Sequence, residues 1–361
     1  MSMRHSTSLL GLCIAIAAVG LPSLAAAQAQ ARDASQWVVP RTPEGHPDLQ
    51  GNWSNATITP LTRREGQSAV LTWDEVATLE GRAAGRLDRL SQPSDPDRAP
   101  PEIGGRVGGS DGLGGDLSYN GVYLDRGDRV AVVNGEPRSS LLTNPPDGRV
   151  PSRTSEGDRR RAEYSEFRSQ FDPYDNPENR PLAERCIMSF GSNAGPPMTP
   201  NSGYNNNYTI VQTPGYVMIH TEMVHDTRII RLSDPLLAPT LPLPDHVRPW
   251  MGDSWGRWEG NTLVVETTNF HALQRYTGNS SENLKVIERF TRVDEETILY
   301  EFTIDDPTTY TQQWGGEVPF KRLDDLVYEY SCHEGNYALA NVLSGARYQE
   351  AQAARNGPEQ R

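Results

Sequence analysis

Apolar and polar residues alternate repeatedly from Tyr208 onward, with the two-residue period of a half-buried β-strand. Turn-forming residues interrupt this alternation at Pro214-Gly215, Gly260-Asn261, 294–296 and Asp324-Asp325. Such residues suit hairpin turns because Gly, Asn and Asp tolerate positive φ, and Pro holds φ at a fixed negative value. We therefore predict about seven or eight strands in hairpin order. A mainly β, antiparallel meander of this kind is expected to close into a barrel or a curled, lipocalin-like sheet, since closure removes exposed edges.

The N-terminal region differs in composition, since it is rich in Gly, Pro and Asp. We predict that it has an irregular structure with two helices. Thr72 and Glu75 form a capping box that opens a helix ending near Leu90. A second helix is predicted over 155–171, and a C-terminal helix over 344–355. The stretch from Ser91 to Asp116 is a long loop, whose order the sequence does not settle. We expect residues 28–200 and the β region, 201–361, to form one compact unit.

The first 27 residues have the pattern of a secretory signal peptide. Arg4 is followed by a short apolar run over 9–19 and by the small residues Ala25 to Ala27. Leu12 precedes Cys13 in place of a small residue, which argues against a lipoprotein anchor. The mature protein is therefore expected to be periplasmic or secreted, without a membrane anchor.

Charge and cysteine count narrow the expected partners. Removing Arg4 with the signal peptide lowers the formal charge from −13 to −14, which disfavours nucleic acid and anionic lipid. The mature chain keeps two cysteines, Cys186 and Cys332, which are expected to form a disulfide in an oxidising compartment. The alternative is a catalytic thiol. The expected partner is a small-molecule ligand or substrate, and nothing in the sequence indicates an oligomeric state.

One strand-like stretch, "YVMIHTEMVHDTRIIRL" over 216–232, carries an unusual density of ionisable groups. In a regular strand His220, Glu222, Asp226 and Arg228 share one face, while His225 lies on the apolar face. Three interpretations stay open at this point. The polar face is solvent-exposed, or it lines a barrel interior, or a β-bulge exchanges the two faces partway.

A second cluster, "CHEGNY" over 332–337, places His333 and Glu334 beside the predicted disulfide. Histidine beside a carboxylate is a common acid/base arrangement. We expect this cluster and 222–228 to meet at one pocket bordered by "GSNAGPPM" (191–198). His225 or His333 is then the base, Glu222 or Glu334 its orienting partner, and Arg228 an oxyanion stabiliser. The full set of candidate catalytic residues is His225, His333, Glu222, Arg228, Glu334 and Asp226.

These residues favour an acid/base enzyme, a lyase, isomerase or hydrolase acting on a small hydrophobic or aromatic molecule. No phosphate loop, dinucleotide fingerprint or HExxH motif is present, so no cofactor is expected. Two G-x-S-x-G matches, at Ser110 and Ser254, lack the strand-then-helix context of a nucleophile elbow. One alternative is a non-catalytic, lipocalin-like binding protein with a pocket lined by Tyr300, Phe302, Tyr328 and Tyr330. Another is a divalent metal held by His225, Glu222 and His333.

Several long motifs resemble those of a large family of exported Gram-negative bacterial proteins. They include "RTPEGHPDLQGNWSNATITPL" (41–61), "ERCIMSFGSNAGPPM" (184–198), "WMGDSWGRWEGNTLVVETTNF" (250–270) and "SCHEGNYAL" (331–339). The resemblance covers almost all of the mature chain and implies a shared fold, but no particular reaction. His220 is not required by the family pattern. The residues that match it are Glu222, His225, Asp226, Arg228, Asp253, Glu259, Glu288, Cys332, His333 and Glu334.

Overall fold

The computed structural model describes residues 37–90, 124–188, 195–201, 203–233, 242–273 and 282–356. The predicted signal peptide and the loop from Ser91 to Asp116, with Ser110, lie outside these residues.

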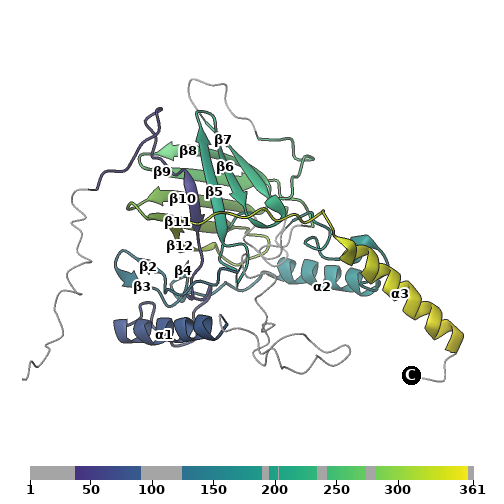
Figure 1. Ribbon diagram of the computed structural model, residues 1–361. Coiled ribbons are helices and arrows are strands. Elements are labelled where there is room, and N and C mark those ends of the chain that lie inside the picture. The colour runs from purple at the N-terminus through teal and green to yellow at the C-terminus, as the bar shows by residue number, and fades with distance from the viewer. Residues whose placement is uncertain are drawn as a thin grey trace, which may run out of the picture. The chain divides into compact units, whose positions relative to one another are not determined.

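A closed β-barrel forms the centre of the described structure (Figure 1). Nine strands follow one another around it in the order β1-β5-β6-β7-β8-β9-β10-β11-β12, and β12 pairs with β1 to complete the ring. The prediction of a mainly β chain that closes into a barrel is therefore confirmed. The strands are β1 (Gly51–Ser54), β5 (Asn207–Thr213), β6 (Tyr216–Thr221), β7 (Thr227–Leu232), β8 (Asp253–Glu259), β9 (Thr262–Thr268), β10 (Lys285–Arg292), β11 (Thr297–Asp305) and β12 (Trp314–Arg322).

Three predicted hairpins are present, joining β5 to β6, β8 to β9 and β10 to β11 in antiparallel pairs. The meander is interrupted once, because β7 and β8 run parallel. The prediction of a further strand after Asp324-Asp325 is wrong. The edge of β12 is already taken by β1 at Trp53 and by β4 (Leu142–Asn144) at Gly315 and Gly316, so a further strand has no edge to join.

β1 is the main feature of the barrel that the sequence did not reveal. It comes from the N-terminal region and pairs with β5 on one side and β12 on the other. A short separate hairpin, β2 (Val132–Val133) with β3 (Glu136–Pro137), also comes from this region. The N-terminal region and the C-terminal β region therefore share one sheet.

The predicted helices are all present. α1 spans Trp73–Leu90, and its capping box is formed: the Thr72 N–H donates to Glu75 Oε2 at 2.7 Å, and the Glu75 N–H donates to Thr72 Oγ1 at 3.3 Å. α2 spans Ser155–Ser169 and is followed by the 3-10 turn η3 (Pro177–Asn179). α3 spans Tyr337–Asn356, so it starts earlier than predicted. No helix in the described residues combines the length and the apolar character needed to cross a bilayer.

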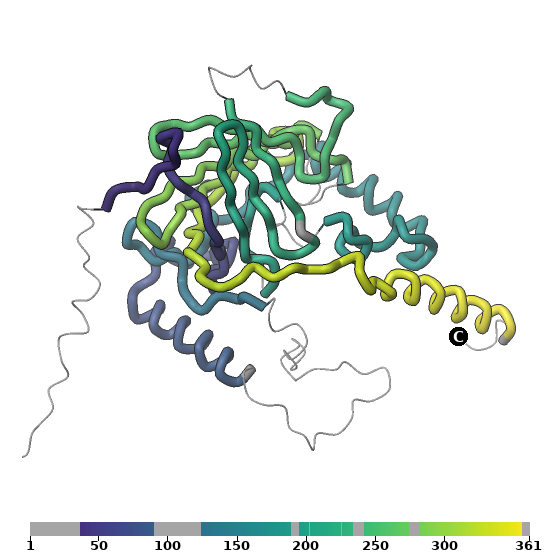
Figure 2. The backbone as a smooth tube through the Cα atoms, turned by 45° about the horizontal axis from the view of Figure 1, so that its top comes forward, coloured from purple at the N-terminus to yellow at the C-terminus, as the bar shows by residue number. Residues whose placement is uncertain are grey.

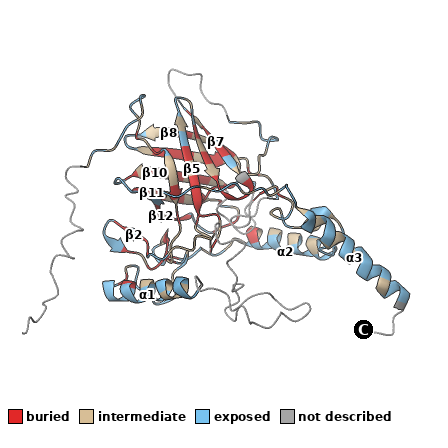
Figure 3. Cartoon of the chain, viewed as in Figure 1, coloured by how far each residue is buried: buried red, intermediate tan, exposed pale blue. Residues whose placement is uncertain are grey.

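Large aromatic side chains fill the interior of the barrel, where burial concentrates on the strands (Figure 3). Alternate residues of β10 and β11 point inward, as the two-residue period requires. Tyr300 and Phe302, proposed above as pocket-lining residues, belong to this packed core, whereas Tyr328 is 43% exposed. The largest side chains of the core include Trp53, Tyr208, Phe290, Tyr300 and Phe320.

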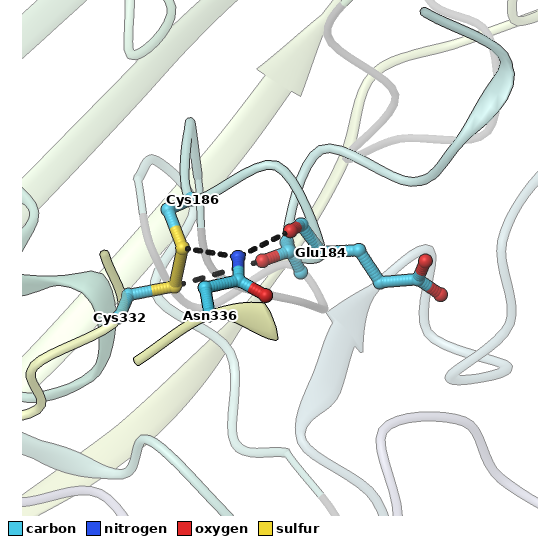
Figure 4. The surroundings of a disulfide bond; sticks show 5 residues. Glu184, Cys186, Cys332 and Asn336 are labelled. Carbon is cyan, nitrogen blue, oxygen red and sulfur yellow. Dashed lines mark hydrogen bonds between the residues drawn. A yellow bond between two sulfur atoms is a disulfide. The ribbon is translucent and has the colours of Figure 1, made fainter. Parts of the chain in front are cut away.

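The Cys186–Cys332 disulfide predicted from the cysteine count is present, with the two sulfurs 2.12 Å apart (Figure 4). The Asn336 amide nitrogen lies beside it, donating to the backbone carbonyl of Glu184 at 2.9 Å and lying 3.3 Å from Cys186 Sγ. The bridge fixes the start of α3 to the segment that precedes the buried residues 195–198.

After β12 the chain runs outside regular structure from Leu323 to Ser331, and we call this segment the strap. It passes the ends of β5, β6 and β7 on its way to α3 (Figure 2). Its side chains are largely exposed, with Leu326 at 73%. The disulfide holds the far end of the strap in place.

Candidate functional site

The stretch predicted as one strand, 216–232, is two strands joined by a tight turn. β6 ends at Thr221, the 3-10 turn η4 spans Met223–His225, and β7 begins at Thr227. The Thr221 N–H donates to the Asp226 carbonyl at 2.8 Å and closes the turn. The turn exchanges the two faces of the chain, so that Arg228 lies inside the barrel while His220 contacts Thr227 outside. An exchange of faces was one of the three open interpretations, although a turn produces it here and not a bulge.

The turn contains a strained residue. Val224 has φ 60° and ψ 10°, the left-handed region, which a β-branched side chain rarely adopts. Such a conformation costs about 1–3 kcal/mol and persists only where surrounding contacts impose it. One of these contacts is the Met223 N–H, which donates to Asn205 Oδ1 at 2.7 Å. Strain of this kind is concentrated in functional turns.

Three consecutive buried asparagines, Asn205 to Asn207, support the turn from the start of β5 and the two residues before it. Asn206 Nδ2 donates to the backbone carbonyls of Asp125 and Asn201, at 2.6 and 3.1 Å. Asn207 Nδ2 instead faces Glu222. Asn207 Oδ1 is buried and has no hydrogen-bond partner among the described residues. The site therefore holds a buried acceptor to which no described protein group donates.

Glu222 is the central group of this site, and its side chain is 1% exposed. Its two carboxylate oxygens lie 3.5 and 3.4 Å from Asn207 Nδ2, and it also accepts a hydrogen bond from the backbone of Tyr328 in the strap. Burial raises the pKa of Glu222 to about 7, and the charge of Asp125 adds to the rise. The hydrogen bonds from Asn207 and Tyr328 oppose it. A carboxyl group with this pKa exchanges protons readily near neutral pH.

The raised pKa predicts how stability depends on pH. Between pH 4.5, the ordinary value, and about 7 the folded state binds more protons than the unfolded state, so Glu222 makes stability fall as pH rises through this window. Across this window Glu222 lowers the free energy of unfolding by roughly 3 kcal/mol. Glu222→Gln is therefore expected to unfold at higher urea than the wild type at pH 8, and at similar urea at pH 4.5. Glu295→Gln, in an exposed turn, is the control. Parallel wild-type and Glu222→Gln profiles would contradict the prediction.

Arg228 forms a buried ion pair with Glu288 of β10. Its Nη1 and Nη2 donate to Glu288 Oε2 at 2.5 Å and Oε1 at 3.0 Å, with both side chains nearly or fully buried. Tyr300 Oη donates to the same Oε1 at 3.0 Å. Burial and the Glu288 charge raise the pKa of Tyr300, so this hydroxyl stays a donor. The role of Arg228 as an oxyanion stabiliser stays a prediction. In the structure its guanidinium group pairs with the Glu288 carboxylate.

The same network holds residues 195–198 against the barrel interior. The Met198 N–H donates to Tyr300 Oη at 2.9 Å, and Asn55 Nδ2 donates to the Met198 carbonyl at 3.0 Å. Met198 Sδ lies 3.7 Å from Arg228 Nη2. Met198, at the end of "GSNAGPPM", therefore lies beside Arg228, in the 222–228 stretch that was predicted to share a pocket with it. Residues 191–194 lie outside the described residues.

The other predicted site residues differ in their exposure to solvent. Asp226 is partly buried and closes the turn through its carbonyl, whereas His333 and Glu334 are exposed. The backbone of Tyr328, in the strap, donates a hydrogen bond to Glu222. His333 follows the strap in the sequence, so this contact does not itself bring His333 to Glu222. The side chain of His225 lies outside the described residues, so its pairing with His333 stays a prediction. In the described part of the chain no group of three or more His, Cys, Asp or Glu side chains is placed to hold a metal.

Sequence reasoning missed the partners that make the site. Sequence analysis did not single out Asn207, and it named Glu288 only among the residues that match the family pattern. The signal for Glu288 was its position in "VIERF", where an inward-facing carboxylate needs a cation. The sequence contains no local sign that Arg228 supplies it.

The chain matches no protein-family model, no curated protein and no solved structure. Membership of the exported Gram-negative family therefore stays a prediction, and the function must be argued from the residues of the site.

Proposed function

We propose that this protein is an exported acid/base enzyme, working without a redox cofactor, in which Glu222 transfers the proton. The observation that carries the proposal is a buried carboxyl group whose pKa is about 7, set beside the unpartnered acceptor Asn207 Oδ1. A general acid or base works best when its pKa lies near the operating pH. The disulfide agrees with an oxidising compartment, the periplasm or the exterior.

In this proposal the substrate is a small hydrophobic or aromatic molecule with one hydrogen-bond donor. The donor binds Asn207 Oδ1, and Glu222 exchanges a proton with the reacting atom. The strap covers Glu222 through the Tyr328 backbone, and most of its side chains face solvent. Substrate enters when the strap moves aside. His225 and Asp226, in the same turn, and His333 with Glu334 are proposed as further proton-transfer or positioning groups.

A library of small aromatic and apolar compounds, incubated in D₂O and separately in ¹⁸O-labelled water, tests the proposal. Mass spectrometry should show the wild type adding deuterium to, eliminating from, or hydrolysing at least one compound. Glu222→Gln is expected to lower that rate by about 100-fold or more, the scale of a lost acid/base group. Glu295→Gln should behave as the wild type.

Two results would overturn this function. No compound changes with the wild type, or Glu222→Gln converts compounds at the wild-type rate. A compound that is retained tightly and recovered unchanged favours the non-catalytic binding protein instead.

A further inference from the structure

Four polar side chains form a row at the end of the barrel where the strap passes. Ser54 of β1 lies opposite Asn207 of β5 in the antiparallel register. The Glu222 N–H, just after β6, donates to the Asn207 carbonyl at 3.2 Å, so Glu222 is the next member. Asp125 adjoins the other end, because Ser54 Oγ donates to Asp125 Oδ2 at 2.5 Å. The row therefore runs from Asp125 through Ser54 and Asn207 to Glu222.

Asp125 is held in place by its backbone surroundings. Its N–H donates to the Gly203 carbonyl at 3.0 Å, and its carbonyl accepts from Asn206 Nδ2 at 2.6 Å. The Gly127 N–H donates to Asp125 Oδ1 at 3.2 Å. Gly127 has φ +67°, and a Cβ there would lie 2.6 Å from the Thr57 backbone nitrogen, so the turn requires glycine. A group positioned in advance in this way lowers the cost of ordering on binding.

The row carries two carboxylates and no basic side chain. Glu222 is 1% exposed and Asp125 is partly buried. Among the described residues neither forms an ion pair, and the guanidinium of Arg126, the nearest cation along the chain from Asp125, lies against Gly203. Burial raises the pKa of Glu222, and the charge of Asp125 adds to the rise. The negative charge at this end of the barrel is therefore uncompensated by the described part of the chain.

Asn207 gives an observation that is independent of these charges. Its side chain is 7% exposed, and Nδ2 lies 3.4 and 3.5 Å from the two oxygens of Glu222. Oδ1, the other end of the same amide, is buried without a hydrogen-bond donor among the described residues. An unpaired buried acceptor is unfavourable, so a bound donor gains most at this atom. The row thus combines a missing positive charge with a missing donor.

We propose that the ligand of this site is a small primary amine, bound as its ammonium ion by the Asp125 carboxylate and Asn207 Oδ1, with Glu222 beside it. The amine is the substrate if the function proposed above is right, and calling it a substrate rests on that function. Its hydrophobic or aromatic body carries the ammonium as the donor group.

The chemistry of the row selects an ammonium group among the possible donors. An ammonium has three N–H donors and no acceptor, and it supplies both the charge and the donor that the row lacks. A neutral alcohol can donate to Asn207 Oδ1 but leaves the charge uncompensated. A divalent ion takes about six or more oxygen ligands, whereas Asp125, Asn207 and Glu222 are three side chains.

Calorimetric titration with benzylammonium chloride at pH 7 tests the proposal, with benzyl alcohol as the neutral compound of the same shape and sodium chloride matching the ionic strength. The wild type should bind benzylammonium saturably at one site, and benzyl alcohol at least about tenfold more weakly, as the loss of a charge-assisted hydrogen bond predicts. Saturating benzylammonium should also lower the pH midpoint of the Glu222 carboxyl signal in ¹³C spectra, since a nearby positive charge favours the carboxylate. Benzyl alcohol should leave this midpoint unchanged.

Asp125→Asn is the decisive variant. It removes the charge and keeps an oxygen that accepts from Gly127, so we expect the far-ultraviolet spectrum of the wild type and benzylammonium binding that is weaker by about tenfold or more. Asp128→Asn, in the same segment but exposed, is the matched control and should bind as the wild type does. Asn207→Leu removes Oδ1 and should weaken binding as well.

The proposal is overturned if benzylammonium does not bind saturably, if benzyl alcohol binds as tightly, or if the Glu222 midpoint stays where it is; all three are measured on the wild type. Unchanged affinity in a folded Asp125→Asn variant would also overturn it. Glu222-dependent conversion of neutral compounds without benzylammonium binding would refute this inference alone. Asp125-dependent binding with no conversion of any compound would support the ammonium site and refute the proposed enzyme.

Discussion

Replacing Cys332 with serine is expected to lower the free energy of unfolding by about 4–5 kcal/mol. The bridge joins residues separated by 146 positions, and a loop of this length loses much conformational freedom in the unfolded chain. Without it the unfolded state gains that freedom, while the barrel hydrogen bonds stay as they are. Urea unfolding of the wild type and the variant measures the difference.

Cys186→Ser and the double variant provide the controls. Each should lose as much stability as Cys332→Ser, because any of the three removes the same cross-link, and reduction of the wild type should do so as well. Thiol labelling of the unreduced, unfolded wild type should detect no free thiol. A loss below about 1 kcal/mol in every variant would show that the bridge contributes little to folding.

Breaking the ion pair between Arg228 and Glu288 is expected to destabilise the protein by about 3–5 kcal/mol for either single replacement. Arg228→Ala leaves the Glu288 carboxylate buried with Tyr300 alone, and Glu288→Ala leaves a buried guanidinium without its carboxylate. An uncompensated buried charge is the cause of the loss, more than the missing attraction.

The double variant Arg228→Met/Glu288→Leu separates these two causes. It removes both charges and keeps apolar volume in the interior, so it should be markedly more stable than either alanine variant. A double-mutant cycle from urea unfolding gives the coupling energy. Two small, additive losses would contradict the account of this pair as a buried and mutually dependent unit.

The features of the fold that could be predicted from the sequence are those that depend on residues close together along the chain. The hairpin turn at Gly260-Asn261 and the capping box of Thr72 and Glu75 depend on residues a few positions apart, and both formed as expected. β1 was missed because Gly51–Ser54 is too short to show a period, and its partners in β5 and β12 lie far along the chain. The extra strand after Arg322 was predicted because the sequence does not show that β12 is already paired.

The site was predictable only in part, for a related reason. Glu222 and Arg228 stood out by residue type, but their partners Asn207 and Glu288 lie on other strands. The break between β6 and β7 was hidden because Val224 is β-branched and favours a strand. Tertiary contacts impose the turn against that preference. Since the turn decides which side chains face inward, the faces assigned from periodicity alone could not hold across it.

Titration of the Glu222 carboxyl carbon by ¹³C NMR tests the central claim most directly, because proton transfer by this residue depends on its pKa. The signal is assigned by its absence from the spectrum of Glu222→Gln. The account predicts a midpoint at about pH 7 for Glu222, well above 4.5, the ordinary value of a glutamate carboxyl group. A Glu222 midpoint at or below 4.5 would contradict it.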